Sequence, residues 1–380
     1  MDFTLNDEQK MMRQVAAEIA DEQLAPKAEE MEERREIPAD LLKFLAEQGY
    51  FGMFLPERYG GAELDYVTYA LTVEEFSRGS PAVALVVSVQ NALVGKPILT
   101  YGTDGQKEKY LAGVAAGELI GAFALTEEEA GSDAANVQTT AAKKDGGYVL
   151  DGHKLYVTNA GLAGLFLVVA RTDAEAGGKG LSCFLIERDT PGFTVGERFD
   201  GMGMRALDVR RLELESCEIS SDALLGKEGE GLKVALASLD GSRIGVAAQA
   251  VGIAQQVFNE AKKYAAEREQ FGRPIISFQG ILFYLVEMAT RLEAARLLTM
   301  RAATLADAGE RFSAEAAMAK LYASEMANFA ANLGVQIHGG YGYMKDYVVE
   351  RFFRDACVTE IYEGTSEVQK LVIAGELLKG

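Results

Sequence analysis

Glu363 has the best-defined setting for acid–base chemistry in this sequence, inside the segment 361–367, IYEGTSE. The two residues before it are apolar and predict partial burial, which raises the pKa of a carboxyl group toward the range of a general base. Ser366 and Gln369 have the spacing of a capping box, so a helix is expected to begin there and to leave Glu363 in the preceding loop. Gly364 has no side chain and lets a ligand approach the backbone closely.

Residue type alone gives a second interpretation of Glu363, a solvated carboxylate in a turn, because glutamate side chains are mostly exposed. Four further segments contain more polar residues and glycines than the apolar pattern around them explains. They are 123–133 (FALTEEEAGSD), 156–159 (YVTN), 267–279 (EREQFGRPIISFQ) and 336–343 (QIHGGYGY). Taken alone, 123–133 is either an acidic surface turn or a loop of small hydrogen-bond donors.

The chain has few residues of the types and spacings that a metal site, a catalytic triad or a phosphate-binding loop requires. It has two histidines, His153 and His338, and three cysteines without a C-x-x-C spacing. Neither a metal site, a His-based triad nor a disulfide framework is therefore expected. The glycines of 226–233 lack the Lys and Ser/Thr positions of a Walker loop, and those of 339–342 lack the strand-turn-helix setting of a dinucleotide fingerprint.

The elements that must position these segments follow from hydrophobic periodicity. Asn6 and Gln9 resemble a capping box at the start of a helix. Apolar periodicity predicts further helices at 66–78 and 83–100, after a turn at Gly60-Gly61. The first third of the chain is therefore expected to be helical.

The hydrophobic period changes between about residues 121 and 225. Asp151-Gly152 predicts a hairpin turn that joins strands at 148–150 and 155–157. Turns rich in Gly and Asp separate four more strand-like runs, 165–170, 181–186, 193–195 and 212–215. This pattern predicts a small β-barrel or sandwich.

Long helices return after about residue 232. Apolar residues recur every three or four positions over 282–305 and 318–337, with a helix cap expected at Ser313. The sequence thus predicts an α+β protein of three domains. They are an N-terminal helical domain (1–120), a middle β domain (121–228) and a C-terminal helical bundle (229–380).

The charge and the cysteine content limit the partners and the compartment. A net charge of −19 argues against nucleic acid and anionic membranes as partners. The first residues lack the features of a signal or transit peptide, and we expect no apolar run of the roughly 20 residues that span a bilayer. Because three cysteines without a pairing pattern suit a reducing compartment, a cytoplasmic location is expected.

The five polar segments, in this order and register, resemble the acyl-CoA dehydrogenase family, and the resemblance extends over nearly the whole chain. Arg351 and Arg354-Asp355 also match positions of that family. The pattern is most similar to the short-chain, butyryl-CoA-type members. The resemblance implies that family's fold, with a C-terminal four-helix bundle, and FAD-dependent oxidation of an acyl-CoA thioester to the trans-2-enoyl-CoA. Glu363 would take the α-proton while the β-hydride passes to flavin N5.

The resemblance also implies which positions bind the ligands, several of them across a subunit interface. Flavin contacts fall on Phe123, Leu125, Thr126, Ser132, Tyr156, Thr158, Arg268, Phe271, Gln279, Gln336, Gly339, Gly340, Thr365 and Glu367. CoA contacts fall on Ser132, Asp240, Arg243 and Gly364. From its spacing alone, Arg243 could instead form a helix-surface ion pair with Asp240, which is the commoner role for such a spacing.

Some positions depart from the family pattern. Glu128 and Glu129 stand where the family usually has Pro and a small residue, and Tyr156 stands where Trp is common. Ser242 occupies the position at which some relatives carry the base, which leaves that role to Glu363. Ala84 aligns with an arginine of glutaryl-CoA dehydrogenases, so an uncharged acyl group is expected, either short, branched or alicyclic.

The same resemblance implies partners. Electron-transferring flavoprotein is the family's usual electron acceptor and a homotetramer its usual assembly, so both are expected here. Three other functions stay open. An acyl-CoA oxidase would pass its electrons to oxygen, a flavin monooxygenase of the same fold would not need Glu363, and a non-catalytic acyl-CoA-binding protein would hold no flavin.

Overall fold

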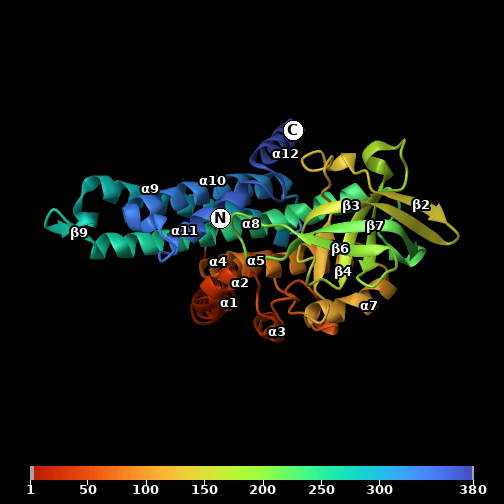
Figure 1. The fold of residues 1–380 in the computed structure, drawn as a ribbon, viewed down its shortest axis with the longest axis horizontal. Coiled ribbons are helices and arrows are strands. Elements are labelled where there is room, and N and C mark those ends of the chain that lie inside the picture. The colour runs from red at the N-terminus through yellow and green to blue at the C-terminus, as the bar shows by residue number, and fades with distance from the viewer. Residues whose placement is uncertain (1–3, 379–380) are drawn as a thin grey trace.

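The computed structural model describes residues 4–378, which form three parts along the chain (Figure 1). The first part is helical and contains α1 (Asp7–Ile19), α2 (Ala28–Arg34), α3 (Ala39–Glu47), α4 (Tyr66–Gly79), α5 (Pro81–Ser88), α6 (Lys96–Tyr101) and α7 (Asp104–Ala115). Two π-helical stretches, η1 (Ala20–Leu24) and η4 (Val89–Gly95), continue α1 and α5. The predicted capping box opens α1, since the side chains of Asn6 and Gln9 each accept from the other's backbone N–H.

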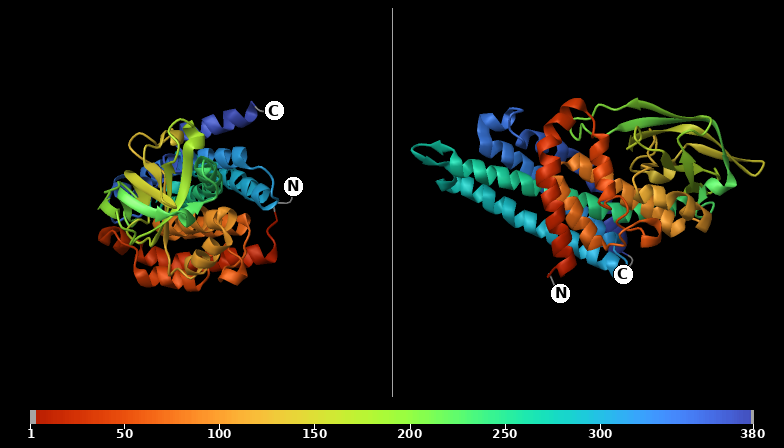
Figure 2. Two further views of the ribbon diagram at one scale, coloured as in Figure 1. Left: turned by 90° about the vertical axis from the view of Figure 1, so that its right-hand side faces the viewer. Right: turned by 90° about the horizontal axis from the view of Figure 1, so that it is seen from below.

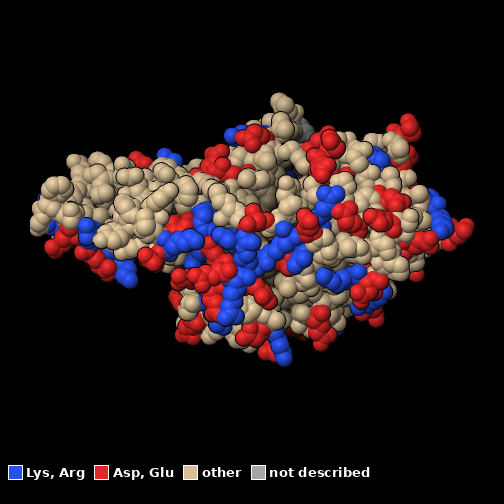
Figure 3. Space-filling view, viewed as in Figure 1, with Lys and Arg blue, Asp and Glu red and all other residues tan. Residues whose placement is uncertain are grey.

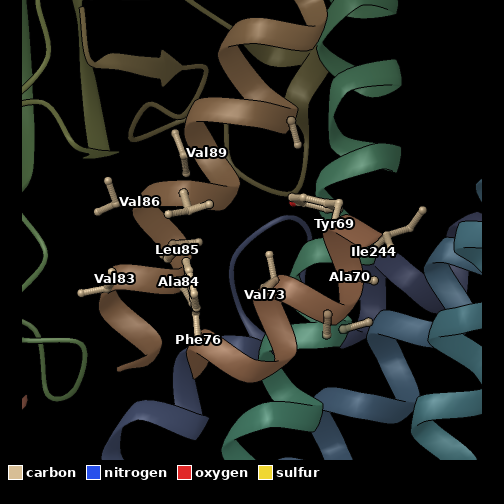
Figure 4. Close-up of a cluster of buried hydrophobic side chains, with 14 of the residues drawn as sticks. Tyr69, Ala70, Val73, Phe76, Val83, Ala84, Leu85, Val86, Val89 and Ile244 are labelled. Atoms are coloured by element: carbon tan, nitrogen blue, oxygen red, sulfur yellow. The ribbon is translucent and has the colours of Figure 1, made fainter. Parts of the chain in front are cut away.

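The segment from α5 to α6 belongs to the core. It packs against α4 and against α8 (Gly231–Glu267), which buries Phe76, Leu85 and Ile244 among other apolar side chains (Figure 4). By length and composition Pro81–Tyr101 could cross a membrane, so the expectation that the chain has no such run was wrong. In this fold 89% of its most apolar window is buried, as in a core helix.

The middle part is an eight-stranded sheet. Its strands are β1 (Gly121–Ala124), β2 (Thr140–Lys144), β3 (Gly147–Thr158), β4 (Leu165–Arg171), β5 (Leu181–Glu187), β6 (Phe193–Arg198), β7 (Val209–Ser220) and β8 (Leu224–Leu225). The order is β6-β7-β3-β2-β4-β5-β8, and β1 pairs in parallel with β4. The four strands expected between 165 and 215 are all present, as β4 to β7.

The predicted hairpin at Asp151-Gly152 is wrong. β3 continues through this dipeptide, and its pairing with β7 shifts register there as a bulge. The Asp151 side chain accepts from the backbone N–H of Ser216 on β7 (2.6 Å). The real turn lies earlier, at residues 145–146, where Lys144 pairs with Gly147. Both sites carry an Asp-Gly dipeptide, so the local signal is the same and the long-range pairing with β7 decides between them.

The C-terminal part is built on three long helices, α8, α9 (Gln279–Asp307) and α10 (Ser313–His338). The shorter α11 (Val349–Cys357) packs along α10 as the fourth, and α12 (Ser366–Leu377) also packs on α10. The small hairpin of β9 (Glu269–Gln270) and β10 (Arg273–Pro274) projects at the end far from the sheet (Figures 1 and 2). The expected cap at Ser313 is wrong, because its hydroxyl donates to Asp240 instead.

An ion pair and a hydrogen bond fix the loop between β6 and β7 to both helical parts. Arg35, which follows α2, pairs with Asp200 in this loop. Arg354 of α11 contacts Glu32 of α2 (2.5 Å) and donates to the carbonyl oxygen of Met202 (3.1 Å). Figure 3 shows Lys and Arg side chains intermixed with Asp and Glu across the middle of one face. The loop is therefore held between two domains.

Candidate active site

A cavity of about 690 Å³ lies where the three parts meet. Its walls come from β1 and the loop after it, from β3, from the loop 199–207, from α5 and η4, from α8 and from the turn before α12. Pockets of about 300–1,000 Å³ are typical for small-molecule ligands. The predicted site residues that line it are Phe123, Leu125, Thr126, Ser132, Tyr156, Thr158, Arg243, Glu363, Gly364 and Thr365.

Glu363 and Gly364 form a left-handed turn in the cavity wall, with φ angles of 54° and 94°. This conformation costs a non-glycine residue about 1–2 kcal/mol, so the surroundings must hold it. The carbonyl oxygen of Glu363 accepts from Arg243 Nε (3.2 Å) and Gln369 Nε2 (3.0 Å). The carbonyl oxygen of Gly364 accepts from Lys320 Nζ and from Gln369 Nε2, both at 2.8 Å.

The helix after this turn begins at Ser366, as predicted, but its cap differs from the prediction. Thr365 caps α12, because its hydroxyl accepts from the backbone N–H of Val368 (3.3 Å). The predicted capping box of Ser366 and Gln369 is wrong. The left-handed turn brings two carbonyl oxygens within reach of the Gln369 amide, and the amide binds them instead.

The carboxyl group of Glu363 is removed from bulk water. Its Oε2 is buried and has no hydrogen-bond partner within residues 4–378. Burial raises the pKa of Glu363 to about 7, although Arg243, Lys320 and Ser242 favour the ionised form. The side chain is therefore not a solvated turn carboxylate. A carboxylate with a pKa near neutrality is well matched to accepting a proton at physiological pH.

Arg243 forms the ion pair with Asp240 that its spacing allows, but in a buried position rather than on the surface. Arg243 Nη1 lies 2.6 Å from Asp240 Oδ1, and the two side chains are 4% and 19% exposed. Arg243 also lines the cavity. Asp240 lies outside the cavity lining and receives the Ser313 hydroxyl as well. Asp240 therefore orients the arginine that reaches the cavity.

A buried ion pair fixes the loop after β1. Lys154 of β3 binds the carboxylate of Glu127 (2.6 Å) and the carbonyl oxygen of Leu125 (3.2 Å). The Glu127 carboxylate also accepts from the backbone N–H groups of Gln138 (2.6 Å) and Thr139 (3.1 Å). Burial opposes ionisation, but Lys154 and these N–H groups outweigh it and lower the pKa of Glu127. The backbone at Leu125 is thus held firmly beside the cavity.

Tyr156 presents a large aromatic face at the cavity wall. It has a left-handed φ of 55°, its side chain is 62% exposed, and its ring lies 4.7 Å from that of Phe199. Thr158 follows two positions later and lines the same cavity. An exposed aromatic ring beside a cavity gives a flat ligand a surface on which to stack.

A second group of predicted residues lies at the far end of the bundle. Arg268, Gly339 and Gly340 line a separate hollow of about 450 Å³. Phe271, at the tip of the β9–β10 hairpin, is 94% exposed. Phe271, Gln279 and Gln336 lie outside the lining of both hollows. Glu367 also lies outside both, but it stands at the start of α12, four residues after Glu363. Within one chain, the structure does not bring this second group to Glu363.

The buried cations Lys320 and Lys154 and the hydrogen bonds of Gln369 to the turn were not predicted from the sequence. A signal for Lys320 exists, since it interrupts the apolar stripe formed by Ala316, Ala319 and Ala323 on α10. Lysine is almost never fully buried unless it is paired, so a lysine on a core-facing stripe indicates a specific acceptor. The acceptors themselves could not be read from the sequence.

Sequence profiles of one family match all three parts of the chain. The acyl-CoA dehydrogenase N-terminal domain matches residues 6–118, the middle domain residues 122–217 and the C-terminal domain residues 229–378. Together these matches extend over most of the sequence, in the order of the helical, β and helical parts.

Full-length relatives agree with the domain matches. An acryloyl-CoA reductase (NADH) of Anaerotignum propionicum is 46% identical, over 100% of this chain and 96% of that protein. The structure of butyryl-CoA dehydrogenase from Megasphaera elsdenii is 41% identical, with a TM-score of 0.97 over 100% of both chains. A chain in the structure described as electron transferring flavoprotein of Acidaminococcus fermentans is 45% identical, with a TM-score of 0.98 over 100% of both. The chain belongs to the acyl-CoA dehydrogenase family of oxidoreductases and is similar to its short-chain, butyryl-CoA-type members.

Proposed function

We propose that the enzyme oxidises a short acyl-CoA thioester to the trans-2-enoyl-CoA, with Glu363 as the base. The supporting observation is the buried carboxyl group with an unpaired Oε2 in the wall of a ligand-sized cavity. Glu363 removes the proton from Cα, the Cβ–H bond gives up a hydride, and the two carbons become doubly bonded. FAD, when bound, supplies the acceptor for this hydride and its electron pair.

The backbone beside the base provides a binding site for the thioester oxygen. Within residues 4–378 the N–H group of Glu363 donates no hydrogen bond, and the residue lines the cavity. An N–H group aimed at this oxygen stabilises the negative charge that develops on it when Cα loses its proton. The same residue would then hold the oxygen with its backbone and take the proton with its side chain.

The cavity walls fit the isoalloxazine ring of FAD. Tyr156 offers an exposed aromatic face, Thr158 and Ser132 offer hydroxyl groups, and Lys154 fixes the backbone at Leu125. The remaining flavin positions, such as Arg268 and Phe271, lie far from this cavity in the same chain. We propose that a second copy of the chain supplies them, within a homotetramer.

The proposed acyl group is uncharged and short, branched or alicyclic. Leu85, Val89 and Leu93 line the cavity from α5 and η4, so this wall offers only apolar side chains. Ala84, at the position of the glutaryl-CoA dehydrogenase arginine, is fully buried. A distal carboxylate would meet no cation on this wall and would lose its hydration there.

Anaerobic bleaching of the flavin band by a panel of acyl-CoA thioesters tests the proposal. We expect rapid bleaching by a short or branched acyl-CoA and little by glutaryl-CoA. The Glu363→Gln variant should bind FAD and thioester but bleach at least ~100-fold more slowly, as for the loss of a general base. A yellow wild-type protein that no thioester bleaches would overturn the proposed reaction.

The similarity to an acryloyl-CoA reductase favours a second candidate, the same chemistry in the reverse direction. Glu363 would then donate the α-proton to a 2-enoyl-CoA. Mixing the dithionite-reduced protein with acryloyl-CoA and crotonyl-CoA tests this direction. Reoxidation that is much faster than the forward bleaching would favour the reductase.

We also propose electron-transferring flavoprotein as the acceptor and the cytoplasm as the location. The match to a chain in an electron transferring flavoprotein structure supports the first proposal, and three free cysteines suit a reducing compartment. Stopped-flow reoxidation by purified electron-transferring flavoprotein, compared with reoxidation by air, tests the acceptor. Faster reoxidation by air would point to an oxidase.

A further inference from the structure

Lys320 is a fully buried cation whose function the reaction above does not explain. It lies in the N-terminal third of α10, with a side chain that solvent does not reach. Its Nζ donates to the carbonyl oxygen of Gly364 (2.8 Å). No carboxylate within residues 4–378 lies in ion-pair distance of it. Burying an ammonium group without a direct counter-ion is unfavourable. A lysine at this position therefore indicates a specific structural or functional role.

The carbonyl oxygen that Lys320 binds belongs to the left-handed turn of the site. Glu363 and Gly364 are both left-handed, and their two carbonyl oxygens are bound by side chains of α8, α10 and α12. Because a peptide group is planar and trans, a carbonyl fixed in one direction fixes the next N–H in the opposite direction. Lys320 therefore fixes the peptide between Gly364 and Thr365, at the end of the turn that carries the base.

The charge of Lys320 acts on the same residue. Among the charged groups around Lys320, Glu363 interacts with its ammonium group most strongly. Glu360 and Glu367 are further acidic neighbours, and Arg243 is a cation that opposes them. Around Glu363 itself lie Arg243, Lys320 and Ser242, together with the hydroxyls of Tyr69 and Tyr362. An ammonium group in this set favours the ionised carboxylate, which is the form that accepts a proton.

We propose that Lys320 is a positioning residue for the proposed dehydrogenation. It holds the Glu363–Gly364 turn from outside the cavity through the Gly364 carbonyl oxygen, and its positive charge favours the carboxylate form of Glu363. The inference rests on the proposed function, because Lys320 would position a base that only the proposed reaction requires. Lys320 itself touches neither substrate nor cofactor.

The test compares Lys320→Met with wild type in the FAD-loaded enzyme. We expect a reduction rate at pH 7 that is about 10- to 100-fold lower, within the range that a displaced or protonated base loses. We also expect the pH at which the rate is half-maximal to rise, and the Kd of the thioester to stay within about 3-fold. Lys370→Met, which removes an exposed lysine of α12, is the matched control and should change neither value.

A second pair of variants separates charge from hydrogen bonding and covers the case in which Lys320→Met does not fold. Lys320→Gln keeps a donor toward Gly364 but loses the charge, so its pH profile should shift with a smaller fall in rate. Lys320→Arg keeps the charge and should restore the profile. A pH profile that is unchanged in both neutral variants overturns the proposal, as does a full rate in Lys320→Met.

A readout without turnover completes the test. The melting temperature of Lys320→Met and of Lys320→Met/Glu363→Gln is compared from pH 5 to 9. The difference in melting temperature between these two variants reports the titration of Glu363 in the absence of Lys320. This difference should level off at a higher pH than the difference between wild type and Glu363→Gln. An identical titration would overturn the proposal. If instead wild type is bleached by no thioester, the reaction fails while this titration still decides the role of Lys320.

Discussion

Arg243 Nε donates a hydrogen bond to the backbone oxygen of Glu363, a residue 120 positions later in the chain (3.2 Å). The same guanidinium binds Asp240 through Nη1 (2.6 Å). Of the two interpretations that the sequence left open, the ion pair within the helix is present, while the CoA contact of Arg243 stays a prediction for a side chain that lines the cavity. The rigid fork of donors on Arg243 lets it bind both acceptors, and a lysine could not span the two in the same way.

The rate of flavin reduction should rise with pH through about 7. Glu363 must be ionised to take a proton, and burial raises its pKa to about 7. Stopped-flow reduction by a saturating thioester from pH 5 to 9 measures this profile. The Glu218→Gln variant, which changes an exposed carboxylate of β7, should keep the wild-type curve. A flat profile in the wild type would contradict the assignment of the base.

Glu363→Gln should stabilise the folded protein at high pH. The pKa of Glu363 is higher in the folded state, at about 7, than the value of about 4.3 expected in the unfolded chain. Its contribution to stability is therefore present below about pH 4 and lost as the pH rises through 7. The melting temperature of the variant should exceed that of the wild type at pH 8 by more than at pH 5. Equal differences at both pH values would argue against a buried, titrating carboxyl group.

Lys154→Met should destabilise the protein by about 3–5 kcal/mol, because it leaves the buried carboxylate of Glu127 without its partner. Urea unfolding measures the loss. The double variant Lys154→Met/Glu127→Gln should recover part of it, since no unpaired charge remains. The exposed pair of Lys144 and Glu218 provides the control, and Lys144→Met should cost less than about 1 kcal/mol. Equal costs for the two lysine variants would show that the buried pair has no special role.

Gly364→Ala should slow the reaction and lower stability. Gly364 has a φ of 94°, and a Cβ atom there would lie 2.7 Å from Gln369 Nε2, which binds the turn. Gly375→Ala is the matched control on α12, because a Cβ atom there meets nothing within 4 Å. An alanine inside a helix should stabilise by about 0.5–1 kcal/mol relative to glycine. Rapid-mixing reduction and urea unfolding of both variants test the contrast, and similar behaviour of the two would refute it.

The local signals in the sequence were sufficient where one element alone determines the outcome. The capping box of Asn6 and Gln9 is present, and the start of α12 at Ser366 was correct. The local signals gave wrong predictions where a distant strand or turn competes for the same hydrogen-bonding groups. The Asp151-Gly152 dipeptide became a bulge because β7 pairs across it, and Gln369 bound the turn carbonyls rather than a helix N-terminus.

The flavin positions at the far end of the bundle show a second limit of prediction from sequence. Phe271 and Arg268 belong to the same predicted flavin set as Tyr156. In one chain, however, the β9–β10 hairpin beside them and the strand β3 that carries Tyr156 lie toward opposite ends of the molecule (Figure 1). Periodicity and motifs describe a chain residue by residue. They do not state which positions meet within one subunit and which require a second copy.

The sequence by itself determined the order of helical, β and helical parts, the family, and the choice of Glu363 as the candidate base. It did so because apolar periodicity and short motifs are local properties of the chain. The tertiary structure decided that Oε2 of Glu363 is buried, that the residue is left-handed and that its pKa is raised to about 7. Burial raises this pKa against the opposing effect of Arg243 and Lys320, which approach from α8 and α10, 120 and 44 residues away from the carbonyl oxygens they bind. Burial and electrostatic environment are properties of packing, and only the folded chain brings these groups together.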